Sequence, residues 1–359
     1  MKQQGKLGIR EYVSIAILMV GAKATEDTPA ILYNHVQNAA WMIPIIAGVI
    51  FFIPFYLLLK TFSIHSEKTL FELIGHLCGK FFGFFICLLI FIINSAVISF
   101  DSRTYTNIIR TYYFTTTPNL VIYALLMFIC AYGAKKGIQH IGSVSYLVIF
   151  YVIISFYLAL LLCLQDANLS AIFPLWGTGK AEIFKGGLSR LTMIIPLVIS
   201  FKDYKKSTWL AYLYVVIQLS IAILVFICLF DVMLSGIGYP FHIAIRYISF
   251  GRFLSNIEIL FLPIWLMAAF VRFSAFLYIN SYMFGHLFKI KDFEYLIPSL
   301  AAIYLLIGMI PEAPIDVSFD FKNKIQYIAG PLYPILCVLL WLIALIKGEF
   351  KHAKQKKSM

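Results

Sequence analysis

The chain has 359 residues, of which 61% are hydrophobic and 13% are charged, and its formal net charge is +12. A soluble protein carries roughly 25% charged residues, so this composition excludes an ordinary soluble domain and indicates a chain surrounded largely by lipid. The positive charge does not indicate nucleic-acid binding, because the Lys and Arg residues stand in short loops between apolar runs, where the positive-inside rule accounts for them.

Short catalytic and cofactor motifs are missing from the sequence. It contains no GxSxG, HExxH, P-loop or dinucleotide-binding pattern, so nothing in it indicates an enzyme. The six cysteines include no CxxC pair and the seven histidines show no metal-ligand spacing, so no metal, cofactor or disulfide framework is expected. The first apolar run ends in charges and not in a small-residue cleavage site, so we expect it to be retained.

Apolar runs separated by turn or charge clusters predict an all-α membrane protein with ten transmembrane segments in one integral domain, residues 1–359, ending in a basic tail at 348–359. The segments are 9–37 (interrupted), 41–60, 80–100, 119–133, 143–164, 186–201, 208–231, 257–285, 295–311 and 329–347. With both termini in the cytoplasm, the inner loops and the two terminal regions together hold 18 of the 29 Lys and Arg residues, as the positive-inside rule expects. Both termini on one side require an even number of segments, and ten is even.

The first segment contains the stretch MVGAKATEDTP, in which charges interrupt an apolar run. Residues 9–22 make about 21 Å of helix, which is too short to cross a hydrocarbon core of about 30 Å before Lys23. Thr28 and Pro29 then suit the start of a new helix. We therefore predict two half-helices, 9–21 and 29–37, joined by non-helical backbone that marks a substrate site. The alternative is an early exit of the segment, with KATED in an outer loop.

The sixth segment, GGLSRLTMIIPLVISF, is also short and carries an internal proline. Breaks in segments one and six of ten predict a five-plus-five inverted repeat, with repeat one at about 9–164 and repeat two at about 186–347. Thr192, Ile195 and Pro196 lie near the second break, where freed carbonyls would hold a ligand amine. Ordinary helix packing is the alternative for Thr192.

Three stretches carry a resemblance to a known family: IREYVSIAILMVGAKATEDTP, NHVQNAAWMIPIIAGVI and LFLPIWLMAAFVRFSAFLYINSYMFGHLF. With the paired breaks, the chain resembles the spore germination permeases, the B subunits of bacterial spore germinant receptors, within the amino acid–polyamine–organocation superfamily. The resemblance implies a subunit in the inner membrane of the spore that acts beside A and C subunits and senses a small nutrient, often an amino acid. The chain departs from many members at AKATED, where they have uncharged small residues.

The candidate ligand-binding residues come from four segments. From segment one they are Gly21, Ala22, Lys23, Thr25, Glu26 and Asp27; from segment three Asn94, Ser95 and Ser99; from segment six Thr192, Ile195 and Pro196; and from segment eight Arg272. Lys23 would receive a ligand carboxylate and Glu26 or Asp27 an ammonium, because ionisable residues inside a membrane are functional by default. The alternatives are a self-neutralising loop for these charges, a structural ion pair without a ligand role for Arg272, and helix packing for Gly21 and the two serines.

Arg272 lies well inside segment eight, where an arginine needs a partner. The resemblance places segments one and eight side by side, so we predict that Arg272 pairs with Glu26 or Asp27. Together with these residues, the resemblance implies a nutrient-sensing receptor subunit that binds a small nutrient, often an amino acid, near the bilayer midplane. A proton-coupled amino acid transporter is the alternative, since both need the same broken helices. A purely scaffolding subunit would leave the intramembrane charges unexplained.

Overall fold

The computed structural model describes residues 7–65, 68–189, 205–248 and 258–350, and within these ranges the regular structure is entirely helical. The α-helices are α1 (Ile9–Gly21), α2 (Thr28–Val36), α3 (Met42–Phe62), α4 (Leu70–Cys78), α5 (Lys80–Tyr112), α6 (Asn119–Lys135), α7 (Ile138–Cys163), α8 (Lys180–Ser189), α9 (Lys205–Phe230), α10 (Pro240–Tyr247), α11 (Glu258–Phe288), α12 (Ile297–Gly308) and α13 (Lys322–Ile346). Two shorter elements matter below: the 3-10 helix η1 (Ala22–Thr25) and the π-helix η8 (Asp316–Phe321).

Within the described residues, six helical stretches are long and apolar enough to cross a membrane. They contain α3, α5, α7, α9, α11 and α13, and two shorter apolar helices lie at Asn119–Lys135 and Phe293–Gly308. Prolines inside α3, α11 and α13 are compatible with membrane helices, because neighbouring helices satisfy the backbone groups that a proline frees. The chain is therefore a multi-pass helical membrane protein, and the count of ten crossings stays a prediction.

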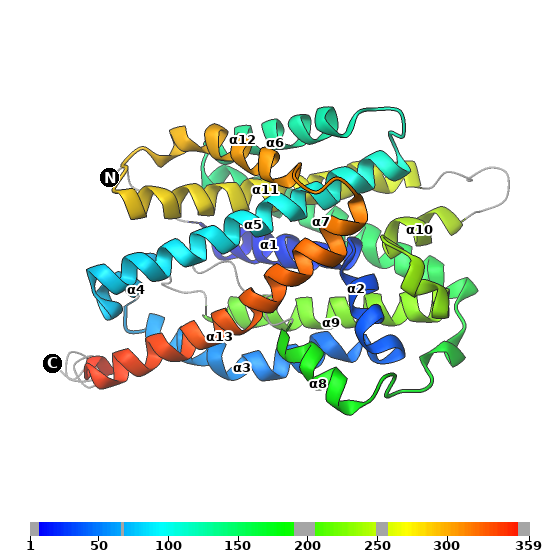
Figure 1. Cartoon of the computed structure of the whole chain (residues 1–359), viewed down its shortest axis with the longest axis horizontal. Coiled ribbons are helices and arrows are strands. Elements are labelled where there is room, and N and C mark those ends of the chain that lie inside the picture. Colours follow the sequence, from blue (N-terminus) through cyan, green and yellow to red (C-terminus); the bar gives the residue numbers. More distant parts are fainter. Residues whose placement is uncertain (1–6, 66–67, 190–204, 249–257, 351–359) are drawn as a thin grey trace.

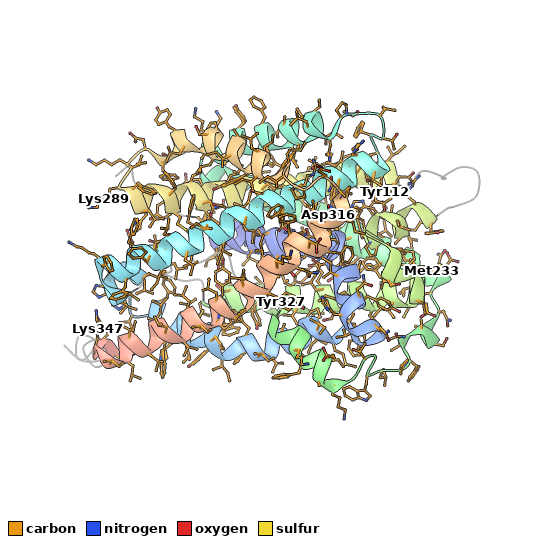
Figure 2. All side chains as sticks on the ribbon, viewed as in Figure 1. Tyr112, Met233, Lys289, Asp316, Tyr327 and Lys347 are labelled. Carbon is orange, nitrogen blue, oxygen red and sulfur yellow. The ribbon has the colours of Figure 1, made fainter. Side chains whose placement is uncertain are left out.

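Helix α1 occupies the interior of the bundle (Figure 1), where it packs against α7, α9 and α11. Helix α5 packs against α11, α12 and α13, and residues from its middle line the same cavity as residues from the last turn of α1. Figure 2 shows Lys289 and Lys347 at one end of the molecule and Tyr112 and Met233 at the opposite end. The break between α1 and α2 lies between these two ends and positions the candidate site.

Two helix boundaries differ from the sequence prediction in a way that matters for the site. The third segment, predicted to end at residue 100, continues as α5 to Tyr112, and the tenth, predicted to begin at 329, is preceded by helix from Asp316. Both extensions are polar, so the sequence reads as loop there. They are helical because their polar side chains, among them Asp101 and Lys322, find partners inside the protein and not in water.

Two amphipathic helices, α4 and α10, lie outside the predicted segments. Helix α4 begins with a capping box in which Thr69 N donates to Glu72 Oε2 at 2.8 Å and Glu72 N donates to Thr69 Oγ1 at 3.4 Å. Helix α10 begins at Pro240, which has the backbone angle of a first helical residue. Most of segment six, from residue 190 to its predicted end at 201, lies outside the described residues, and with it the predicted break.

Candidate functional site: a buried ion cluster at the helix break

The predicted interruption of the first segment is present. Helix α1 ends at Gly21, one 3-10 turn follows, and α2 begins at Thr28 after extended backbone at Glu26. Asp27, and not Thr28, occupies the cap position of α2. Thr25 Oγ1 donates to the Ala22 carbonyl at 2.7 Å, which satisfies one of the backbone groups that the break frees.

Glu26 and Asp27 are fully buried and face two cations from distant helices. Arg272 Nη2 of α11 lies 3.6 Å from Glu26 Oε1, so the predicted pairing of Arg272 with a carboxylate of the break is confirmed. Lys322 Nζ at the start of α13 lies 2.7 Å from Asp27 Oδ1 and 3.5 Å from Glu26 Oε2. The self-neutralising alternative would pair Lys23 with Glu26 and Asp27, but among the described residues Lys322 pairs with both carboxylates.

A third carboxylate, Asp101 of α5, joins the two cations. Its Oδ2 lies 2.5 Å from Arg272 Nη2 and its Oδ1 lies 3.2 Å from Lys322 Nζ. The Tyr105 hydroxyl accepts a further hydrogen bond from Arg272 Nη1 at 3.2 Å. Charges taken out of water are tolerated only when they are paired and hydrogen-bonded, so this cluster holds the break, α5, α11 and α13 in one arrangement.

The charges of the cluster balance when Lys23 is included. Glu26, Asp27 and Asp101 supply three negative charges, and Arg272 and Lys322 supply two positive charges. Lys23 supplies the third positive charge, is half-buried, and forms no ion pair with any residue that the structure describes. Its ammonium is therefore the one cation of this balanced set that no described carboxylate holds in an ion pair, and a ligand role for it stays a prediction.

A cavity of about 50 Å³ lies beside the cluster, between α1, α5, α11 and α13. Its polar lining comprises Lys23, Asn94, Asp101, Lys322, Gln326 and Tyr333, and the rest of the lining is apolar. Such a volume holds more than one water molecule. Lys23 thus lies against a polar cavity. Ala24, Thr25, Glu26 and Asp27 are buried, so KATED is not a solvated loop, and its depth in the membrane stays a prediction.

A second cavity, of about 40 Å³, lies on the other side of the break and is lined by Gly21, Ala22 and Thr25. Gln218 of α9 also lines it, and a Cβ on Gly21 would stand 2.6 Å from Gln218 Oε1. The close approach of α9 leaves no room for a side chain at residue 21 unless Gln218 shifts, which supports the packing alternative for Gly21. The ligand roles of these three residues stay predictions.

Aromatic side chains cover the cluster on the side of α10. The Trp265 ring stacks on Tyr105 with centroids 4.7 Å apart, and Trp265 Nε1 donates to Thr25 Oγ1 at 2.9 Å. His242 of α10 packs edge-on against Trp265 at 4.6 Å. Burial lowers the pKa of His242 to about 3, so its imidazole is neutral and adds no charge to the cluster.

The predicted polar residues of segment three divide between two environments. Asn94 lines the cavity beside Lys23 and accepts a hydrogen bond from the Tyr333 hydroxyl at 2.6 Å. Ser95 and Ser99 do not line it. Ser95 Oγ donates to the Phe91 carbonyl and Ser99 Oγ to the Ser95 carbonyl, so both hydroxyls serve helix α5 and its packing. Thr192, Ile195 and Pro196 lie outside the described residues.

Sequence reasoning missed Asp101 and Lys322. Each stands in a polar stretch next to an apolar run, DSRTYTN and DFKNK, and these stretches lie outside the predicted segments. A signal was present, because each charge stands within a few residues of a predicted membrane segment, where an ionisable residue calls for a partner. An ionisable residue next to a membrane segment needs a partner of opposite charge, and this need indicates both Asp101 and Lys322 as candidates.

The broken first segment and the bundle of apolar helices around it define a multi-pass, permease-like membrane protein. Residues 11–317 match the family described as spore germination protein. The chain therefore belongs to the spore germination protein family, as the resemblance in its sequence predicted.

Three relatives from Bacillus subtilis (strain 168) illustrate the distances within the family. The chain is 22% identical to spore germination protein YndE over 350 residues, covering 94% of this chain and 93% of the relative. It is 20% identical to spore germination protein KB over 371 residues, covering 97% and 96%. Spore germination protein B2 is 24% identical over 178 residues, which is 47% of this chain and 48% of that relative. The similarity is low in identity but extends over nearly the full length of two of the three.

Proposed function

We propose that this chain is the nutrient-sensing membrane subunit of a spore germinant receptor. It resides in the inner membrane of the spore, acts beside receptor A and C subunits, and binds a small germinant near the bilayer midplane. The proposal includes ten crossings in two inverted repeats with both termini in the cytoplasm. Membership of the spore germination protein family and the broken first segment support it.

An amino acid is the germinant class that fits the cavity best. The observation that carries this assignment is that a cation without an ion pair among the described residues, Lys23, and a carboxylate, Asp101, line the same cavity. A zwitterion needs one group of each sign. Lys23 receives the ligand carboxylate. The ligand ammonium is received by Asp101 or by the carbonyls of residues 22–26 that the break frees from the helix, in place of the predicted Glu26 or Asp27, which do not line this cavity.

Ligand binding would act through the partners of Lys322. A ligand carboxylate near Lys23 competes with Asp27 and Asp101 for the Lys322 ammonium. A ligand ammonium competes with Lys322 for the Asp101 carboxylate. Lys322 begins α13 directly after the π-helical turn η8, a geometry that recurs at functional sites. A germinant that binds better to the arrangement with exchanged partners shifts the equilibrium toward it, and that shift is the signal.

The experiment is a germination assay over the common amino acids, in spores that lack the gene and in spores that carry it back on a plasmid. The proposal expects that the deletion removes the response to one amino acid class and leaves other germinants effective, and that the plasmid restores it. A deletion without effect on any germinant would contradict it. Uptake of the same labelled amino acid by the purified protein in liposomes would instead support the proton-coupled transporter.

A further inference from the structure

Three side chains that can bind a metal meet at the end of the molecule where α13 finishes. His65 stands in the turn after α3, His76 in the last turn of α4, and Glu349 just after α13. In Figure 1 the end of α13 lies close to α4, and Figure 2 shows Lys347 of that end, whose ammonium donates to the His76 carbonyl at 3.3 Å. None of the three side chains belongs to the ion cluster. They lie at the C-terminal ends of α3, α4 and α13.

The geometry of the three ligand atoms is close to that of a zinc site. Glu349 Oε1 lies 3.1 Å from His76 Nε2 and Glu349 Oε2 lies 3.8 Å from His65 Nε2, and one ligand atom from each residue falls within 4.8 Å of the others. Two atoms bound at 2.0–2.1 Å by a tetrahedral ion stand roughly 3.3 Å apart. Small side-chain rotations therefore suffice to close the site.

A second observation points to a ligand. His65 Nε2 is buried and has no hydrogen-bond partner among the described residues, although it faces Glu349. A buried polar atom without a partner costs free energy unless something binds to it. The rings of His65 and His76 lie edge to face with centroids 5.2 Å apart, so both nitrogens are held toward the same carboxylate.

We propose that His65, His76 and Glu349 form a binding site for one divalent transition-metal ion of the zinc type. Two imidazoles and one carboxylate are a ligand set that holds Zn²⁺ with a water molecule in the fourth position. Glu349 supplies negative charge to offset the cation, while the Lys347 ammonium is directed to a backbone carbonyl. The bound ion fastens the C-terminal end of α13 to α4 and to the turn after α3, and the other end of α13 carries Lys322.

Sequence spacing hides this site. His65 and His76 are eleven positions apart and on different elements, and Glu349 is 273 positions from His76. None of the spacings that mark zinc motifs brings these residues together. Only the packing of α13 against α4 does so.

The test uses the full-length protein, purified in detergent with a tag that contains no histidine, and titrated with Co²⁺ and then with Zn²⁺. We expect one Co²⁺ per chain with the intense visible bands of tetrahedral coordination, displaced by equimolar Zn²⁺. H76N and E349Q should each weaken binding at least about tenfold, since loss of a group that only hydrogen-bonds to a metal ligand already costs 10–100-fold in affinity. H140N, which removes an exposed histidine elsewhere, is the matched control and should bind as the unmodified protein does.

The variant H76C distinguishes the loss of a metal ligand from misfolding of the protein. A thiolate at this position should keep the cobalt bound and add a thiolate-to-cobalt charge-transfer band, which a structural effect alone cannot produce. A chain that binds no cobalt, or that keeps its cobalt spectrum in both H76N and E349Q, would overturn the proposal. Because the site is remote from the germinant cavity, either result leaves the receptor assignment to be judged by the germination assay.

Discussion

Two buried polar regions lie on helix α5, around Ser95 and around Asp101, less than two turns apart. They differ in charge. Around Ser95 the groups are neutral: the Tyr304 hydroxyl and the Asn280 amide lie 3.2 Å and 3.3 Å from Ser95 Oγ. Around Asp101 the groups are charged, and Asp27 Oδ2 and Arg272 Nε lack hydrogen-bond partners among the described residues.

We interpret the difference as one between helix packing and the proposed recognition of a ligand. Side chains of the neutral network each use hydrogen bonds to one another or to backbone carbonyls, as Tyr123 does with the Ser99 carbonyl at 2.8 Å, so the network joins α5, α6, α11 and α12. The charged cluster retains unused hydrogen-bonding capacity, a cavity and the Lys23 ammonium. A region with unused polar groups and space can bind a ligand, whereas a satisfied one only holds helices together.

The largest effect is expected from Lys322→Gln. Lys322 is the common partner of all three carboxylates, and removal of one partner from a buried ion pair costs 3–5 kcal/mol. We expect a loss of about 5 kcal/mol in the free energy of unfolding, at the top of that range. Thermal unfolding of the purified protein measures it. Lys324→Gln, two residues along and exposed, is the control and should stay within about 0.5 kcal/mol.

The second-largest effect is expected from Arg272→Gln. We expect a loss of about 3 kcal/mol in the free energy of unfolding and no germination response to the amino acid germinant. Arg272 has two carboxylate partners, and its loss leaves Glu26 with Lys322 alone. Protein level in spores and the germination rate are the readouts, with the exposed Arg110→Gln of α5 as the control. Normal protein level together with a normal response in Arg272→Gln would refute a role of this residue in the site.

The smallest effects are expected in the neutral network. Ser95→Ala should cost about 1 kcal/mol of unfolding free energy, because it removes ordinary uncharged hydrogen bonds, and Ser99→Ala should cost less, since its hydroxyl donates only within its own helix. Both variants should germinate as the unmodified protein does, at every germinant concentration. A shift of the dose–response curve by tenfold in either one would place that serine on a ligand path and remove the distinction between the two regions.

The sequence predicted the helix break and one ion pair of the charged cluster. The break after Gly21 followed from the length of helix that precedes Lys23, and the need of Arg272 for a carboxylate followed from its place in an apolar segment. The sequence could not tell the polar stripe at Ser95 from the charged stretch at Asp101 by function, because hydropathy records polarity and not partners. Asp101 and Lys322 were missed since tertiary contacts hold their polar stretches in helices that local composition disfavours. Histidines brought together by the end of α13 left no local pattern at all.

The most direct test of the central claim is whether Lys23 reads the carboxylate of the germinant. Spores are given the active amino acid and its carboxamide, which keeps the ammonium and lacks the negative charge, in the background of the unmodified chain and of Lys23→Gln. Hydrogen bonds to charged groups contribute about 1.5–3 kcal/mol, so we expect the unmodified receptor to favour the acid by about tenfold or more and Lys23→Gln to respond to both equally. An unchanged preference for the acid in Lys23→Gln would contradict the account.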